Sequence, residues 1–353
     1  LKHALSSSSS TSRVLSGIQP TGVPHLGNFC GAISKWVDLQ DGFDQQEDTT
    51  TLQSRLSRLY AVVDQHAITV PYNPATMPSQ VRSLVAALLA SGLDPKRNVL
   101  FKQSDVRYHT ELAWYLGCIT PIGWLNRMTQ YKQKEQAQKM ESGLGLLAYP
   151  VLMAADILVY KATHVPVGDD QIQHLELARD IAATFNSRFQ RDVMVKPMAV
   201  ESDHQQSLYR IMNLREPTTK MSKSDPSPKS RIDLTDTGSQ VRKKIMGATT
   251  DSLDGIWYDK SERPGISNLL SIFSAVTDQS VDALVVQYGN YRTGEFKREV
   301  ASAVVAKICP IGDRIRDYES DPAFLDAVLA EGAERASEVA AETMKEVKAA
   351  MGL

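Results

Sequence analysis

Cysteine is scarce in this sequence. The 353 residues contain three cysteines, Cys30, Cys118 and Cys309, which lie far apart and leave one thiol over after any pairing. This arrangement excludes a disulfide framework and lacks the close spacing of zinc ligands. The sequence therefore predicts a reducing compartment, small buried cysteine side chains and no metal ion held by protein ligands.

Long apolar runs and an excess of one charge are also missing. No apolar run approaches the roughly 18 residues that a membrane span needs, so a soluble protein with no membrane partner is expected. The formal net charge of −2 excludes a surface that is basic throughout, and binding of nucleic acid would need a local patch. With 42% apolar residues, the chain can bury one large or two moderate cores.

Acidic residues are absent from the beginning of the chain, where Asp38 is the first carboxylate. The segment LKHALSSSSSTSR has a run of five serines and three basic or histidine side chains, so residues 1–12 are expected to form a disordered tail. Arginine and serine without acids are typical of organelle transit peptides. The tail therefore favours the mitochondrial matrix, with the cytoplasm as the alternative if the tail is unrelated to targeting.

Patterns of strand and helix alternate after this tail. Strands are predicted at RVLSGI, LYAVV, NVLFK, HVPVG and near VMVKP, and segments with helical spacing of apolar residues separate them. The alternation predicts an α/β fold with a doubly wound, Rossmann-like parallel sheet and a helical insertion over about 110–160. From about Asp236 only amphipathic helical segments follow. The expected boundaries are an α/β domain over 13–226 and an all-helical C-terminal domain over 227–353.

A glycine-rich loop joins the first predicted strand to the first helix. In SGIQPTGVPHLGN this turn contains Gly17, Gly22 and Gly27. At the carboxyl end of a strand in an open α/β sheet, glycines let a ligand approach the backbone, and the helix N-terminus offers N–H groups to phosphate. The spacing matches neither GxGxxG nor the Walker loop. The loop is therefore a candidate phosphate-binding site that is neither a dinucleotide-binding loop nor a Walker loop. The alternative is a tight turn that needs its glycines only for their backbone conformation.

A second, basic element lies much later in the chain. Residues 220–224 spell KMSKS, and Asp225 and Pro226 then end the segment as a loop. Two lysines on a mobile loop supply compact positive charges that can follow the β- and γ-phosphates of a nucleotide. Taken alone, the motif could also be a solvated basic turn.

Together the two elements resemble the signatures of class I aminoacyl-tRNA synthetases. Residues 25–28, HLGN, are similar to the HIGH signature with its last His replaced by Asn, KMSKS is the second signature, and SGIQPTG resembles the tryptophanyl enzymes specifically. The resemblance runs from about Val14 to Leu353. It implies that residues 13–226 form a class I catalytic domain, in which tryptophan attacks the α-phosphate of ATP, pyrophosphate leaves and tryptophan then passes to tRNA(Trp).

The resemblance also implies roles for cations and a nucleotide site. No protein nucleophile is needed, because catalysis comes from holding the reactants in line and stabilising charge on phosphorus and pyrophosphate. Lys220 and Lys223 take this catalytic role, and Lys132 is a third candidate with an exposed helix face as the alternative. Mg²⁺ is expected to bind through phosphate oxygens and water. The expected ATP-binding residues are Gln19, Pro20, Thr21, His25, Gly27, Asn28, Gly168, Asp169, Asp170, Ile211, Lys220, Met221, Ser222, Lys223 and Ser224.

A carboxylate in an apolar run marks the expected amino acid pocket. Tyr149, Met153 and Asp156 recur at i, i+4 and i+7 in YPVLMAAD, which places them on one face of a helix, with Pro150 in its first turn. Asp156 needs a partner, which an indole N–H would provide; the alternative is an incidental carboxylate on a buried helix. Tyrosyl-tRNA synthetases carry Gln where Met153 stands, so the resemblance favours tryptophan. The tryptophan-binding residues it implies are Asp156, Tyr149, Met153, Val165, Val167, Gln171, His66 and Gly17.

By the same resemblance the enzyme is a homodimer whose C-terminal helical domain reads the tRNA anticodon. Arg242, Lys243 and Lys244 form a local basic cluster there, which a solvated helix face explains equally well. The chain departs from bacterial relatives in a longer loop over 41–58 and in Leu15, which replaces an aromatic residue. The alternatives are a tyrosyl-tRNA synthetase and a nucleotidylyltransferase of similar fold, and the helical domain argues against the latter.

Overall fold

The computed structural model describes residues 12–44, 58–129, 143–168, 171–200 and 210–353. Within these residues five strands form one sheet in the order β3-β2-β1-β4-β5, and every pairing is parallel. The predicted doubly wound sheet is confirmed. The strands are β1 Val14–Ile18, β2 Arg58–Val62, β3 Val99–Lys102, β4 His164–Val165 and β5 Met198–Ala199.

Strand β1 lies at the centre of the sheet, where the chain order reverses. It pairs along its length with β2, from Val14 opposite Arg58 to Ile18 opposite Val62, and through Val14 with His164 of β4. The chain first builds the sheet on the β2 side and then returns to the β4 side. In such a sheet the crevice at the carboxyl ends of the strands flanking the reversal binds ligands, so β1 and β4 point to the site.

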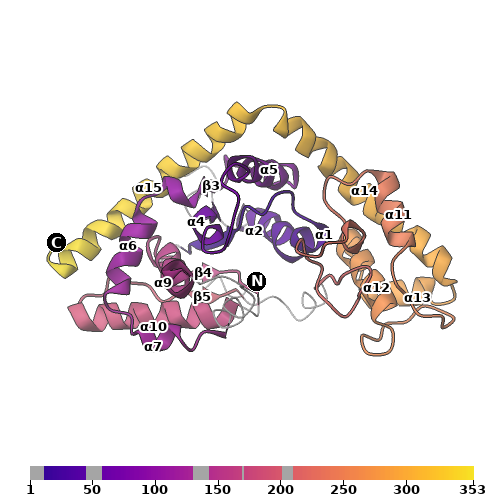
Figure 1. The fold of residues 1–353 in the computed structure, drawn as a ribbon, viewed down its shortest axis with the longest axis horizontal. Helices are drawn as coiled ribbons and strands as arrows, with labels where there is room; N and C mark the ends of the chain where they lie inside the picture. Colours follow the sequence, from indigo (N-terminus) through magenta and orange to yellow (C-terminus); the bar gives the residue numbers. More distant parts are fainter. Residues whose placement is uncertain (1–11, 45–57, 130–142, 169–170, 201–209) are drawn as a thin grey trace.

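Helices cover both faces of this sheet (Figure 1). After β1 one continuous helical segment contains a single π-helical turn, η1, and Trp36 from this segment stacks on Tyr60 of β2 with ring centroids 4.5 Å apart. The helices of this half are α1 Leu26–Asn28, η1 Phe29–Ile33, α2 Ser34–Asp44, α4 Asp64–Ala67, α5 Met77–Ala90, η2 Gln103–Asp105, α6 Tyr108–Gly117, α7 Ile122–Leu125, α9 Leu144–Leu158 and α10 Ile172–Phe189.

The predicted place of Pro150 is wrong, and the strand expected near VMVKP is confirmed. Pro150 lies in the interior of α9, not in its first turn, because the apolar residues before it already start the helix at Leu144. The last strand lies just after VMVKP, at Met198–Ala199, because it is the pairing with His164–Val165 that fixes its position. Val193, in the segment just before this strand, is buried in the apolar core.

The C-terminal helices return to the sheet. Helix α14 crosses α5, and α15 lies over the edge strand β3 (Figure 1). Gly332 of α15 approaches so closely that a Cβ there would lie 1.8 Å from the Leu100 carbonyl oxygen. The expected succession of helices is confirmed, whereas the boundary at residue 226 remains a prediction. These elements are η5 Pro228–Ser230, α11 Gly238–Met246, α12 Pro264–Thr277, α13 Val281–Tyr288, α14 Thr293–Glu319 and α15 Pro322–Met351.

Two large apolar clusters form the core. One joins α2 and α5 to helices α11–α14, and the other joins α6, α9 and α10 to α15. No single helix among the described residues is long and apolar enough to cross a membrane, and α12 and α13 reach that length and composition only when joined across a bend of 112°.

Candidate active site

Glycines shape the loop that follows β1. A Cβ at Gly17 would lie 2.8 Å from a methyl carbon of Val63, so a larger residue would collide with the segment after β2. Gly22 has a φ of +84°, a left-handed conformation that favours glycine. Between them Gln19 and Thr21 are exposed, and Pro20 is buried. The loop therefore presents polar groups at the carboxyl end of the central strand.

His25 caps the helix that follows this loop. Its Nδ1 accepts a hydrogen bond from the Asn28 N–H over 3.2 Å, and the Asn28 Oδ1 accepts one from the His25 N–H over 3.1 Å. This reciprocal pair gives Asn28 a physical role at the fourth position of the motif, since its amide oxygen satisfies a main-chain N–H. Gly27 leaves room for the ring, because a Cβ there would lie 3.0 Å from the His25 Cε1.

The His25 imidazole is neutral at physiological pH. Burial, followed by the charge of Lys223, lowers the pKa of His25 to about 4, although Asp233 opposes this shift. Because Nδ1 accepts the capping hydrogen bond, the proton of the neutral ring resides on Nε2. His25 can therefore donate a hydrogen bond to a phosphate but does not act as a general acid or base near pH 7.

KMSKS starts on a short hairpin. Met212 and Lys220 form an antiparallel bridge, and the Met221 N–H donates to the Ile211 carbonyl over 3.1 Å. Met221 and Ile211 are both buried in the core, whereas Lys220 is exposed. The buried methionine anchors the motif and leaves the lysines on either side available to a ligand.

Lys223 connects KMSKS to the loop after β1. Its Nζ donates to the Thr21 carbonyl over 3.0 Å, and a Cβ at Gly22 would lie 3.8 Å from the same nitrogen. Burial lowers the pKa of Lys223 to about 8, with Asp233 opposing and Arg231 adding to the shift. The two predicted motifs, far apart in sequence, thus form one site with a partly desolvated ammonium group over the loop.

Polar contacts hold the end of the KMSKS segment. The hydroxyl oxygens of Ser222 and Ser224 lie 2.7 Å apart. Asp225 accepts hydrogen bonds from Asn213 Nδ2 over 2.7 Å and from the Ser227 N–H over 2.8 Å. Asn213 belongs to the hairpin, so its amide ties the end of the motif to its start. Sequence reasoning missed Asn213, for which no motif gave a signal.

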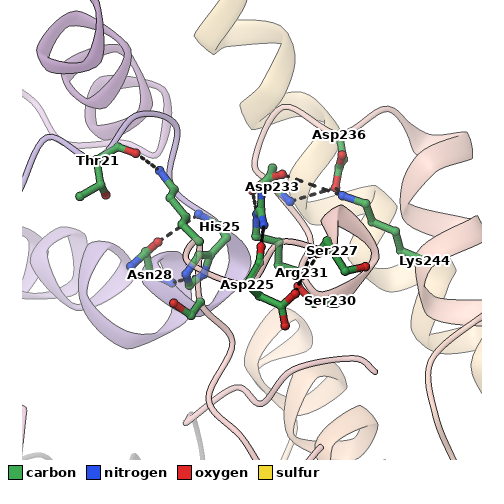
Figure 2. Close-up of polar contacts among 12 residues, drawn as sticks. Thr21, His25, Asn28, Asp225, Ser227, Ser230, Arg231, Asp233, Asp236 and Lys244 are labelled. Atoms are coloured by element: carbon green, nitrogen blue, oxygen red, sulfur yellow. Dashed lines mark hydrogen bonds and ion pairs between the residues drawn. The ribbon is translucent and has the colours of Figure 1, made fainter. Parts of the chain in front are cut away.

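A charged network continues from this segment to α11. Arg231 Nε donates to Asp233 Oδ1 over 3.0 Å, the Asp233 N–H donates to Asp236 Oδ2 over 2.9 Å, and Lys244 bonds to the same Asp236 oxygen. Figure 2 shows these residues opposite Thr21, His25 and Asn28. The pairing of Lys244 means that this member of the predicted basic cluster already has an acidic partner within the chain.

The three residues expected to line the amino acid pocket lie on one helix, as the helical spacing predicts. Tyr149, Met153 and Asp156 all lie within Leu144–Leu158, with Tyr149 and Asp156 buried and Met153 partly buried. The Tyr149 hydroxyl is 2.9 Å from His174 Nε2. The Tyr149 ring meets the His66 ring edge-on at 6.4 Å. The helix therefore presents an aromatic, a thioether and a carboxylate side by side.

Asp156 has the partners that a buried carboxylate needs, and three of them belong to the protein itself. His66 Nε2 is 2.7 Å from Asp156 Oδ2, and both His109 Nδ1 and Gln103 Nε2 are 2.7 Å from Oδ1. Burial alone would raise the pKa of Asp156, but the His66 charge and the hydrogen bonds from His109 and His66 outweigh it and hold the pKa well below its usual range. The carboxylate is therefore ionised and can only accept hydrogen bonds.

Sequence reasoning found His66 and missed Gln103 and His109. His66 follows the carboxyl end of β2, which suggested a pocket position. Gln103 follows β3 in the same way, so the same signal could have found it. His109 is on α6 and gave no signal, because only the tertiary structure brings it to α9.

The remaining predicted residues lie near β4 and the start of α10. Val165 is buried, Val167 packs partly buried against the core, and Gly168 is exposed. The Gln171 N–H donates to the Gly168 carbonyl over 2.8 Å, just before α10 begins. The predicted residues Lys132, Asp169 and Asp170 lie outside the described residues.

Comparisons with known proteins identify the family of this chain. Residues 7–307 match the family described as tRNA synthetases class I (W and Y). A tryptophan--tRNA ligase of Nostoc is 43% identical over 340 residues, which cover 96% of this chain and 97% of that protein. The tryptophanyl-tRNA synthetase structure of Mycoplasma pneumoniae has a TM-score of 0.82 at 34% identity, covering 98% of both chains. That of Campylobacter jejuni, solved with ADP and tryptophan, has a TM-score of 0.78 at 32% identity, covering 97% of this chain and 100% of that one.

The chain belongs to the class I tRNA synthetases for tryptophan and tyrosine. The family match covers most of its length. Within that family it is a tryptophanyl-tRNA synthetase of the bacterial type, as the nearly full-length similarity to bacterial tryptophan--tRNA ligases shows.

Proposed function

We propose that this enzyme activates L-tryptophan with ATP and transfers it to tRNA(Trp). The observation that carries the proposal is the hydrogen bond from Lys223 Nζ to the Thr21 carbonyl, which places KMSKS over the loop after β1. The pocket with Asp156 lies on the same side, at the carboxyl ends of the strands. A nucleotide on the loop and an amino acid in the pocket would therefore meet at the centre of the sheet.

The chemistry needs no protein nucleophile. A carboxylate oxygen of tryptophan attacks the α-phosphorus of ATP, the bond from that phosphorus to the bridging oxygen breaks, and pyrophosphate leaves with the electron pair. Lys220 and Lys223 stabilise the charge that grows on pyrophosphate, while His25 Nε2–H donates to phosphate. In the second step a terminal ribose hydroxyl of tRNA attacks the carbonyl carbon of the adenylate, and AMP leaves.

Mg²⁺ fits this site as a partner of ATP. Among the described residues, no three or more His, Cys, Asp or Glu side chains are grouped to hold a metal ion. Mg²⁺ would be held through phosphate oxygens and water, which suits its octahedral preference, and it would supply further charge neutralisation when bound. The residues of this chain hold the phosphates themselves, through the loop after β1 and the KMSKS lysines.

The amino acid pocket suits an indole ring. The indole has an N–H donor and no acceptor, and the ionised Asp156 carboxylate only accepts. Met153 offers a polarisable apolar surface to the ring. The same pocket is lined by Tyr149, Val165, Val167 and His66. Gly17 allows the substrate to approach the floor of the pocket closely, and Gln171 binds the amino group of the substrate.

The decisive test is amino-acid-dependent exchange of pyrophosphate into ATP with each of the twenty amino acids. Exchange with tryptophan alone is the expected result. Exchange with tyrosine, or none with any amino acid, would refute the proposal. Charging of tRNA(Trp) with labelled tryptophan then tests the second step separately.

The enzyme is further proposed to act as a homodimer. Large apolar side chains on α6, α7 and α9 are exposed, with Trp114, Ile122 and Leu144 at 73%, 66% and 78% of their full area. Clusters of exposed apolar residues often mark protein interfaces. Sedimentation of the purified protein as a dimer, and as a monomer after Trp114→Glu, is the expected outcome; sedimentation of the unmodified protein as a monomer would refute it.

Two further proposals concern the tRNA and the compartment. The C-terminal helices bind the anticodon, where Arg242 and Lys243 are exposed cations on α11. Charge reversal at Lys243 should raise the KM for tRNA without changing pyrophosphate exchange.

The mitochondrial location is supported by the composition of the first thirteen residues, and imaging of the full-length precursor in cells tests it.

A further inference from the structure

Fully buried polar side chains surround one oxygen of Asp156. Gln103, His109 and Tyr160 are each 0% exposed, and they come from η2, α6 and the turn after α9. Polar groups in such positions are costly unless each one is hydrogen-bonded. The activation chemistry proposed above uses Lys220, Lys223 and His25 and needs none of the three, so that chemistry does not explain them.

The hydrogen bonds of this cluster form a directed chain. Gln103 Nε2 and His109 Nδ1 both donate to Asp156 Oδ1, each over 2.7 Å. Because a carboxylate only accepts, His109 donates through Nδ1, and its Nε2 lies 2.8 Å from the Tyr160 hydroxyl. Burial and the Asp156 charge raise the pKa of Tyr160 well above its usual value. The phenol therefore stays protonated within hydrogen-bond distance of the imidazole.

The other carboxylate oxygen faces the more open side. Asp156 Oδ2 lies 2.7 Å from His66 Nε2, and the His66 side chain retains about 10% of its exposure whereas that of His109 retains none. One hydrogen bond from His66 leaves a further lone pair on Oδ2. With Oδ1 holding two donors from the buried side, a substrate N–H can be accepted only by Oδ2.

Packing and a main-chain contact hold this arrangement in place. The Phe101 ring lies 5.8 Å from the His109 ring and 5.7 Å from the Tyr160 ring. Gln103 Oε1 accepts a hydrogen bond from the Gln65 N–H over 3.2 Å, and Gln65 precedes His66 on α4. One buried amide therefore positions both the carboxylate and the helix that carries its second partner.

We propose that Gln103, His109 and Tyr160 are positioning residues that determine specificity for an aromatic side chain with an N–H donor. They fix the rotation of the Asp156 carboxylate so that Oδ2 is aimed at that donor. The inference rests on the proposed function, in which Asp156 binds the indole of tryptophan. A carboxylate free to rotate would still accept a hydrogen bond. Part of the binding free energy would then be offset by the entropy lost when the Asp156 side chain becomes ordered.

The test compares tryptophan with L-β-(benzothiophen-3-yl)alanine, in which sulfur replaces the indole N–H. The readout is the ratio of kcat/KM for the two substrates in pyrophosphate exchange. The unmodified enzyme should favour tryptophan about 10- to 100-fold, the worth of a hydrogen bond to a charged group. Tyr160→Phe should lower this ratio by about threefold and His109→Leu by about tenfold. His109→Asn, which can place an amide N–H near the position of Nδ1, should restore most of it.

A matched control separates positioning from damage to the fold. Tyr115→Phe removes a hydroxyl on the same helix as His109, where its partner is Glu111, and should leave the ratio unchanged. A variant that lowers kcat/KM equally for both substrates has only lost structure, and that result for both Tyr160→Phe and His109→Leu would overturn the inference. If instead Asp156→Asn leaves the ratio unchanged, the proposed role of Asp156 itself fails.

Discussion

Replacing Asp156 by asparagine keeps the shape of the side chain but exchanges one acceptor oxygen for a donor. The amide oxygen can still accept from Gln103 and His109, as Oδ1 does now. The new NH₂ group then takes the place of Oδ2, where His66 can accept from it by placing its own proton on Nδ1. The internal hydrogen bonds survive, so the free energy of unfolding should fall by only about 1 kcal/mol.

The same substitution should severely impair tryptophan binding. The NH₂ group would face the indole N–H, so a hydrogen bond to a charged acceptor, worth about 1.5–3 kcal/mol, is replaced by two opposed donors. The KM for tryptophan should rise about 100-fold, while the KM for ATP stays within about twofold. Pyrophosphate exchange measures both constants, and urea denaturation measures the stability.

Asp156→Leu provides the comparison. It leaves three buried donors without a partner, which should lower the free energy of unfolding by about 3–6 kcal/mol. An unchanged KM for tryptophan in a folded Asp156→Asn variant would refute the reasoning, and so would an equal rise in the KM for ATP.

Three further predictions concern other parts of the molecule. Lys223→Ala should slow activation more than it weakens tryptophan binding, and equal effects in pyrophosphate exchange would contradict a transition-state role. The pKa of Lys223 is lowered to about 8, so its charge is present below that pH and is lost above it. The kcat/KM for ATP should therefore fall as the pH rises through about 8. Lys223→Arg should abolish that fall, since arginine stays charged. Gly332→Ala should destabilise the protein by about 3 kcal/mol in thermal unfolding, because the new Cβ would lie 1.8 Å from the Leu100 carbonyl oxygen. Gly294→Ala is the control. Its Cβ would have no atom within 4 Å, so this variant should be as stable as the unmodified protein or slightly more stable.

Short-range patterns in the sequence were enough to predict the elements and the two phosphate motifs. The alternation of strand and helix follows from local apolar periodicity, which the chain encodes residue by residue. The same periodicity placed Tyr149, Met153 and Asp156 on one helix. The predicted place of Pro150, in the first turn of the helix, is wrong. Proline is also tolerated inside a helix when burial of the neighbouring apolar side chains stabilises that helix enough, and only the packed structure shows this burial.

The partners of Asp156 could not be predicted in the same way. A buried carboxylate requires donors, but the donors Gln103 and His109, and Tyr160 behind His109, come from different elements. Their meeting point depends on how α6 and α9 pack beside β3. The sequence alone identified the carboxylate and its need for a partner. Tertiary structure decided that Oδ1 meets Gln103 and His109, whereas Oδ2 meets His66 alone and keeps a further lone pair.

The meeting of the two phosphate motifs shows the same division. The sequence by itself determined that a glycine-rich loop and a KMSKS segment exist, because both depend on the residue types at consecutive positions. Only the tertiary structure placed Lys223 on the Thr21 carbonyl and lowered its pKa, since burial and the charges of Asp233 and Arg231 act through space and not along the chain.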